Sequence, residues 1–327
     1  MRIWLDRGHD ITITSREKDI TIRLLDSCGF PHINLGRCGT SPFSLACELP
    51  ARCARLLAII RRETPDIMTA IGGTFIAPVG RLTGTTAVTF TDTENATVSN
   101  AISFPLTHHL VVPSCYKKPV KRKVINYNGY HELAYLHPKY FSPDSSVLDL
   151  LCMKEGEKFV ILRFVSWKSG HDVGHSGLSP DMKRKAVNMF SRHARVFISS
   201  ESELPPDLEP YKIPISPKQM HDALYYATML YGESATMASE CAVLGTPAIY
   251  LDNAGRGYTD EQEARYGAVF NFTESLEDQE KSILKGIEIL NTENVKNLWQ
   301  AKRDKLLNDK IDVTGFVADL VEKLAER

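Results

Sequence analysis

The sequence has little net charge, no paired-cysteine motif and no long apolar run. Its 327 residues include 39 lysines and arginines and 40 aspartates and glutamates, for a net charge of −1, so overall charge gives no reason to expect a nucleic-acid partner. The seven cysteines include no CxxC pair, which argues against a disulfide framework or a structural zinc site and fits a reducing cytoplasm. No run is apolar enough to span a bilayer and Met1–His9 lacks a signal-peptide core, so we expect a cytoplasmic protein, with peripheral membrane contact left open.

The same absences narrow the chemistry. The sequence contains no HxH or HExxH spacing, so we expect neither a metal nor another cofactor. Hydrophobic residues make up 43% and charged residues 24% of the chain, which is typical of a globular protein. Strand-like and helix-like segments alternate in both halves of a chain long enough for two domains. This pattern predicts an α/β fold with two Rossmann-like domains facing a cleft.

The most informative stretch is GESATMASECAVLGTPAIY, residues 232–250. Thr236–Leu244 has helix-forming character, Gly245 supplies a C-cap, and the sequence from Ala248 onward indicates a buried strand. The small residues of the preceding turn are Gly232, Ser234 and Ala235. The stretch therefore predicts a turn, a short helix and a strand.

A small-residue turn at the start of a helix can bind an anion. The first backbone N–H groups of a helix have no partner inside it and carry partial positive charge, which suits a diphosphate. Glu240 lies one turn into the helix, where its carboxylate could accept hydrogen bonds from two vicinal hydroxyls. The alternative is a simple connection in which Glu233 and Ser234 cap the helix.

Two further candidates lie at predicted strand ends in the first half. Gly72 and Gly73 follow a short buried strand, where open α/β sheets bind ligands, although a tight turn into a helix explains them equally. Asp92 and Glu94 follow the next strand and could act as general acid or base. Alternatively, they cap the following helix.

The second half opens with FVILRF, a predicted buried strand, followed by a polar loop. Arg163, Lys168 and His171 could face phosphate oxygens there, Arg163 through its bidentate guanidinium. The alternative is an exposed surface loop.

Three segments carry a resemblance to a known family. TMASECAVLGTPAI, residues 236–249, resembles the nucleotide-sugar motif of GT-B glycosyltransferases, in particular the N-acetylglucosaminyltransferase that makes lipid II, and of the UDP-N-acetylglucosamine 2-epimerases. Together with YNGYHELAYLHP (127–138) and EQEARYG (261–267), it identifies the chain as a member of an archaeal and bacterial domain-of-unknown-function family, number 354, in this superfamily.

The resemblance implies a glycosyltransferase that uses a nucleotide sugar, with UDP as the expected nucleotide, and an unknown acceptor. In the glycosyltransferase, the glutamate five residues before Gly-x-Pro holds the ribose of UDP, and Glu240 stands five residues before Gly245. The alternatives are a UDP-sugar 2-epimerase and a non-catalytic nucleotide-sugar-binding paralogue. The epimerase's His-Arg-x-x-Asn-like run is replaced here by FVSWKSGHD, which favours the transferase.

The site expected from the residues and the resemblance has two parts. The catalytic candidates are Glu94, Asp92 and His171. The substrate-binding candidates are Arg163, Asp172, Gly232, Glu233, Ser234, Ala235, Thr236, Glu240, Gly72 and Gly73.

Compared with this superfamily, the chain is expected to comprise an acceptor-side domain (1–140), a nucleotide-sugar domain (141–308) and a C-terminal helix (309–327) that crosses back. Its start departs from the pattern. Met1–Leu5 and Asp10–Ser15 both look like strands, but a parallel crossover needs a dozen or more residues. We therefore expect the first domain to lack its first loop and helix. The alternative is a two-stranded hairpin.

Overall fold

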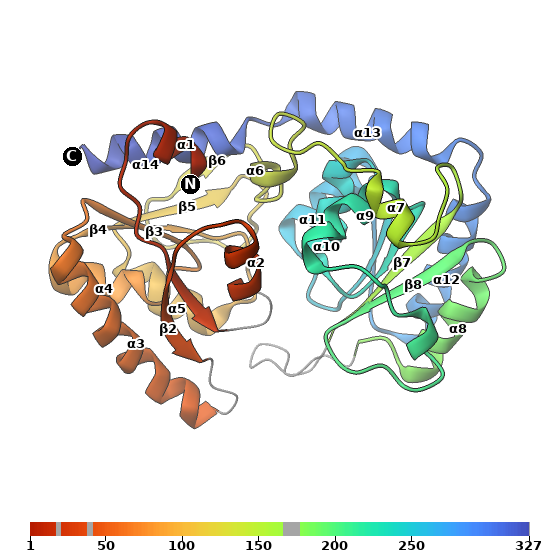
Figure 1. The fold of residues 1–327 in the computed structure, drawn as a ribbon, viewed down its shortest axis with the longest axis horizontal. Helices are drawn as coiled ribbons and strands as arrows, with labels where there is room; N and C mark the ends of the chain where they lie inside the picture. Colours follow the sequence, from red (N-terminus) through yellow and green to blue (C-terminus); the bar gives the residue numbers. More distant parts are fainter. Residues whose placement is uncertain (18–20, 38–41, 166–176, 327) are drawn as a thin grey trace. The chain divides into compact units, whose positions relative to one another are not determined.

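The structure is a computed structural model and describes residues 1–17, 21–37, 42–165 and 177–326. The chain divides into two compact units. The first contains residues 1–114, 118–128 and the helix α14 (Val313–Ala325), and the second contains residues 115–117 and 129–312. Figure 1 shows the α/β character of each unit. None of the described helices is long and apolar enough to cross a membrane.

The first unit contains two parallel sheets. Its strands are β1 (Thr14–Glu17), β2 (Ile33–Arg37), β3 (Ile67–Ile71), β4 (Thr86–Phe90), β5 (His109–Pro113) and β6 (Ile125–Tyr127). Its other helices are α1 (Arg2–Asp6), α2 (Thr21–Ser27), α3 (Pro42–Glu63), α4 (Ile76–Thr83) and α5 (Thr97–Leu106). Strands β1 and β2 form one sheet, and the other runs β3-β4-β5-β6.

Helices α3 and α4 pack on one face of the longer sheet through a small apolar core. The buried members of this core are Leu56, Ile60, Met68, Ile76, Val79 and Ala87. Because side chains alternate along a strand, Met68 reaches this core, whereas Thr69 and Ile71 lie on the opposite face of β3 and are exposed. Helix α14 contacts β3 and β4 (Figure 1).

The start of the chain differs from the expectation. Met1–Leu5 is not a strand, because Arg2–Asp6 forms the helix α1, in which no residue is buried. The indole N–H of Trp4 donates to the Ala318 carbonyl of α14 (3.3 Å), and Arg7 pairs with Asp319 at 2.9 Å. The hairpin alternative is also wrong, because the first strand begins only at Thr14 and pairs in parallel with β2 across α2.

The second unit is built on one parallel sheet of five strands. Its strands are β7 (Phe159–Phe164), β8 (Arg195–Ser200), β9 (Met229–Gly232), β10 (Ala248–Leu251) and β11 (Val269–Phe272). Its helices are α6 (Leu133–Leu136), α7 (Ser146–Leu150), α8 (Pro180–Phe190), α9 (Met220–Tyr226), α10 (Ala235–Leu244), α11 (Gly257–Glu261), α12 (Leu276–Asn291) and α13 (Val295–Asp309), with shorter turns η1 (Glu209–Tyr211), η2 (Pro217–Gln219) and η3 (Gln262–Tyr266).

Helices cover both faces of this sheet. Figure 1 shows α8 and α12 on one side and α9 and α10 on the other. Strand β7 is therefore a continuous apolar run, and Val160, Ile161 and Leu162 are all fully buried. The apolar content of the strands, rather than any alternation, gives this sheet its place in the core.

The strand order identifies where a ligand can bind. The order is β11-β10-β9-β7-β8, so the chain leaves β7 for β8 on one side and later returns to place β9 on the other. Ligands of open α/β sheets bind outside the carboxyl ends of the strands at such a reversal. Here the reversal lies between the ends of β7 and β9, at Val165 and Gly232.

Candidate functional site

The turn after β9 is tightly constrained. Gly232 has φ +153°, and a Cβ at this position would overlap the carbonyl oxygen of Arg163 on the neighbouring strand β7. The next amide, that of Glu233, donates to the same carbonyl at 3.0 Å. Glycine at 232 therefore lets the chain turn from the sheet into α10 beside the end of β7.

Helix α10 begins at this turn with unused hydrogen-bond donors. Ser234 is the N-cap, and its Oγ accepts the amide of Met237 at 3.3 Å. The amides of Ala235 and Thr236 donate to no acceptor among the described residues. Their partial positive charge adds to that of a ten-residue helix, so this end of α10 can accept an anion.

Glu240 lies one turn further along α10, on the same face as Thr236. Its side chain is 8% exposed, and its Oε1 accepts from the Tyr135 hydroxyl at 2.9 Å and lies 3.0 Å from Nε2 of His221. Because a carboxylate only accepts, Nε2 of His221 must be the donor. Among the described residues no hydrogen bond reaches Oε2. The carboxylate therefore keeps one oxygen for another partner.

Sequence reasoning gave Tyr135 and His221 no assigned place in the site. His221 stands near the start of α9, in the otherwise largely apolar MHDALYY helix, and Tyr135 lies in α6. His221 could have been selected from the sequence because it is a polar residue in a largely apolar helix. The signal for Tyr135 is its position in the aromatic segment that carries the family resemblance.

Glu233 is directed away from the ligand position proposed for it. Its carboxylate is fully buried and accepts the amides of Val165 (2.9 Å) and Leu178 (2.5 Å), and Nζ of Lys183 lies 3.4 Å away. The cap on α10 comes from Ser234 alone. Glu233 thus fastens both ends of the segment that links β7 to α8.

Arg163 is also engaged inside the second unit. Its guanidinium donates to Ser199 Oγ at 2.9 Å and pairs with Glu201 at 2.6 Å, both at the end of β8. A phosphate would have to compete with the Glu201 carboxylate for it. His171 and Asp172, together with Lys168, lie outside the described residues.

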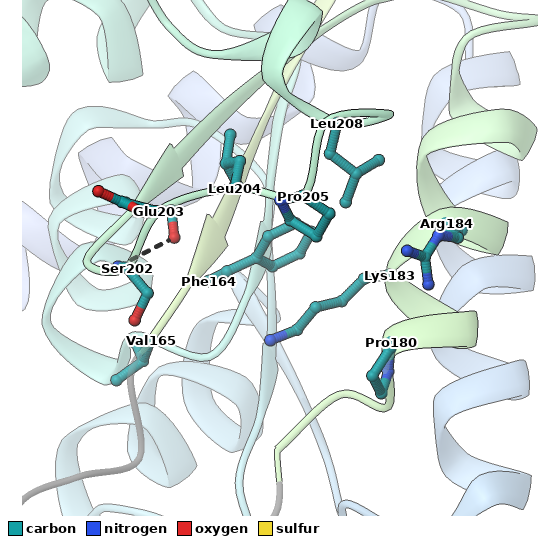
Figure 2. A pocket seen from close by; sticks show the side chains of 11 residues that line it. Phe164, Val165, Pro180, Lys183, Arg184, Ser202, Glu203, Leu204, Pro205 and Leu208 are labelled. Carbon is teal, nitrogen blue, oxygen red and sulfur yellow. Dashed lines mark hydrogen bonds between the residues drawn. The ribbon is translucent and has the colours of Figure 1, made fainter.

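A small cavity lies at the ends of β7 and β8, with a volume of about 210 Å³. Figure 2 shows Phe164, Leu204 and Leu208 around it, with the Lys183 side chain extending along one wall. Nζ of Lys183 lies 4.8 Å from the centre of the Phe164 ring. Pockets for drug-sized ligands span about 300–1,000 Å³, so this cavity alone does not hold a nucleotide sugar.

In the first unit the structure brings the predicted strand-end residues together. Gly72 donates its amide to the carbonyl of Phe90 at the end of β4, directly before the turn that carries Asp92 and Glu94. Gly73 has φ +65°, and a Cβ there would overlap the Thr89 side chain. Gly73 therefore has a packing reason to be glycine, whereas Gly72 has a backbone reason, its φ of +78°.

Asp92 and Glu94 lie just before α5, but neither is its N-cap residue. That position is Ala96, which makes no side-chain capping hydrogen bond. Oδ1 of Asp92 accepts from the Thr93 hydroxyl at 2.8 Å, and both acidic residues are partly exposed. Both residues lie just past the carboxyl end of β4, at one edge of the longer sheet. The described residues contain no cluster of His, Cys, Asp or Glu able to hold a metal ion.

Solved structures resemble the chain over nearly its full length. MurG from Acinetobacter baumannii is 13% identical, with 98% of this chain and 93% of that chain covered and a TM-score of 0.59. The UDP-GlcNAc 2-epimerase from Methanocaldococcus jannaschii is 12% identical, with 92% and 93% covered and a TM-score of 0.60. The glycosyltransferase VinC in complex with dTDP is 13% identical, with 99% and 94% covered and a TM-score of 0.62. No curated protein matches the sequence.

These likenesses, together with the parallel sheets of the two units, define a GT-B type fold of two Rossmann-like domains, of the kind that glycosyltransferases and UDP-GlcNAc 2-epimerases share. At such low identity they define the fold alone. Residues 1–255 match the family described as "Protein of unknown function (DUF354)", and the chain belongs to that family.

Proposed function

We propose that the protein is a glycosyltransferase that binds a nucleotide-sugar donor in its second unit. The observation that carries the proposal is the start of α10. Two amides without acceptors among the described residues lie there at the reversal of strand order, and the Glu240 carboxylate follows one turn later. The donor diphosphate would bind the turn Gly232–Thr236, and the ribose hydroxyls would donate to Glu240. A UDP-linked sugar is the first donor to test.

The helix end would also serve the chemistry. As the glycosidic bond to the diphosphate breaks, negative charge grows on the leaving oxygen, and donors that are already oriented stabilise it without reorganisation. A base must remove the acceptor's proton, and the candidates for this step are Asp92, Glu94 and His171. Acceptor binding is assigned to the first unit, and the acceptor itself is unknown.

The binding experiment is calorimetric titration of the full chain with UDP, UDP-N-acetylglucosamine, GDP-mannose and dTDP-glucose. We expect saturable binding of one of them and about a tenfold or greater loss in Glu240→Ala, because a hydrogen bond to a charged group contributes about 1.5–3 kcal/mol. The melting temperature should stay close to wild type. Glu280→Ala is the matched control, because this carboxylate is exposed and pairs only with Lys185 among the described residues. Unchanged affinity in Glu240→Ala would refute the assignment.

The fold neighbours make a 2-epimerase the second candidate. Incubation with UDP-N-acetylglucosamine alone separates the two activities. A transferase leaves the sugar unchanged without an acceptor, whereas an epimerase inverts C2. Saturable binding with neither C2 inversion nor transfer to any acceptor would instead favour a non-catalytic binder.

A further inference from the structure

The hydrogen bonds around Glu240 are distributed unevenly between its two oxygens. Oε1 receives both the Tyr135 hydroxyl and Nε2 of His221, while Oε2 receives none among the described residues. Here two donors from two different helices converge on a single atom.

The two donors are themselves held in place. The rings of Tyr135 and His221 lie 5.4 Å apart, and the Phe141 ring meets His221 edge-on at 6.3 Å. The segment that carries Tyr135 is fastened a few residues later, where the Tyr140 hydroxyl donates to Asp312 at 2.7 Å and Lys139 pairs with the same carboxylate. The direction from which Oε1 is approached is therefore fixed by packing.

The cluster also lies where a ligand can reach it. The exposed fraction is 8% for the Glu240 side chain and 33% for the His221 side chain, and Tyr135 as a whole residue is 40% exposed. The carboxylate is thus held near the surface of its unit, on the same face of α10 as the exposed Thr236.

We propose that Tyr135 and His221 are positioning residues that occupy Oε1 of Glu240 and so present Oε2 to the 2′- and 3′-hydroxyls of a ribose. This rests on the proposed function and adds the substrate class, which is ribonucleoside diphosphate sugars in preference to their 2′-deoxy counterparts. A deoxyribose brings one donor fewer to Oε2, so the arrangement predicts discrimination at the sugar rather than at the base.

The test is the ratio of dissociation constants for matched ribo and deoxy nucleotides, measured calorimetrically with UDP and dUDP and with GDP and dGDP. We expect the wild type to prefer the ribonucleotide of whichever base binds by about tenfold, the effect of one good hydrogen bond. In Tyr135→Phe and His221→Leu the preference should fall to about threefold or less. The loss should come from the ribonucleotide, with deoxynucleotide affinity retained, which also shows that the variants are folded.

Two further variants make the test of this preference more specific. His221→Gln retains an N–H donor near the position of Nε2 and should recover most of the preference. Tyr266→Phe is the matched control, because this hydroxyl also donates to a carboxylate, that of Asp309 at 3.2 Å, but takes no part in the contacts around Glu240, so the preference should remain at the wild-type value.

The outcomes separate the two ideas. If a nucleotide binds in a manner sensitive to Glu240→Ala while Tyr135→Phe and His221→Leu keep the full preference, the positioning role is refuted and the donor site stands. An equal loss of affinity for the ribonucleotide and the deoxynucleotide in these variants also refutes the positioning role. Such a loss would mean that the substitutions disturb the packing of the site as a whole. If the wild type binds no nucleotide, both proposals fail.

Discussion

The two units differ in the position that their first strand takes in its sheet. In the second unit the first strand, β7, lies inside a continuous sheet with β8 on one side and β9 on the other. In a doubly wound sheet of order 3-2-1-4-5-6 the first strand likewise separates the second from the fourth. In the first unit β2-β1 and β3-β4-β5-β6 are separate sheets, and no described strand bridges them. The division falls where the position of a first strand would be.

The exposed fractions of strand residues also differ between the two units. Leu162 of β7 is fully buried, whereas Ile71 of β3 is 74% exposed and Thr69 beside it is also exposed. The exposure is found at β3, which is the last strand of its sheet, whereas Val88 and Thr89 of the neighbouring strand β4 are fully buried. The central strand of the second unit is therefore part of a closed core, and the edge strand of the first unit is not.

The largest effect on stability is expected from truncating a buried side chain in the five-stranded sheet. Leu162→Ala should lower the free energy of unfolding by about 2–5 kcal/mol, the usual cost of truncating a buried leucine. Hydrogen exchange followed by mass spectrometry locates the effect, since peptides of β7–β9 should lose protection while those of β3–β5 keep it. Equal loss in both sets would mean that the units unfold together.

The next effect concerns the buried carboxylate beside β7. Glu233→Ala leaves the amides of Val165 and Leu178 without their acceptor and Lys183 without its partner, so we expect a loss of about 2–4 kcal/mol. Denaturant unfolding monitored by the buried Trp299 in a Trp4→Phe, Trp167→Phe background reports on the second unit. Glu203→Ala is the control, on the wall of the neighbouring cavity. A midpoint equal to that of the control would show that the carboxylate does not hold the segment.

A smaller effect, on the stability of the second unit, depends on pH. Burial lowers the pKa of Lys296 to about 8, although its ammonium donates to Thr246 Oγ1 at 2.9 Å. The unfolded chain, with a pKa near 10.5, binds more protons between these values, so this lysine's penalty is full below pH 8 and is relieved as pH rises toward 10.5. Relative to Lys296→Met, the wild type should gain about 1–2 kcal/mol between pH 8 and 10. Tyrosines and the other cysteines titrate in both proteins, so the difference reports on Lys296 together with the buried Cys241 thiol, whose pKa burial raises and the lysine lowers in part. A constant difference would contradict the lowered pKa.

The smallest effect is the counterpart of the first. Ile71→Ala removes an isoleucine that is 74% exposed, so the free energy of unfolding should change by less than about 0.5 kcal/mol. The measurement is the same exchange experiment, read from peptides of β3–β5. A loss as large as that of Leu162→Ala would mean that this face of β3 is covered in solution and would remove the contrast between the units.

The regular part of the fold was readable from sequence. The helix expected at Thr236–Leu244 is α10, Ala235–Leu244, with Gly245 in the left-handed region at its C-cap as expected. A continuous apolar run predicts a buried parallel strand, and a glycine directly after a helical segment predicts the end of that helix. The α/β fold and the family were likewise predicted and are confirmed.

What the sequence did not reveal depends on distant partners. Met1–Leu5 has strand composition, but a strand needs a neighbour, and the segment instead lies along α14 as a helix. Glu233 looked like a ligand or cap residue, yet its partners lie 68 and 55 residues earlier in the chain. No local pattern encodes such contacts.

The Glu233 carboxylate also makes two separate backbone positions depend on one side chain. The amides of Val165 and Leu178 both donate to it, one just after β7 and the other shortly before α8. A mutation of this single codon therefore disturbs two places in the chain at once, so we expect position 233 to tolerate fewer substitutions than the partly exposed Ser234 beside it.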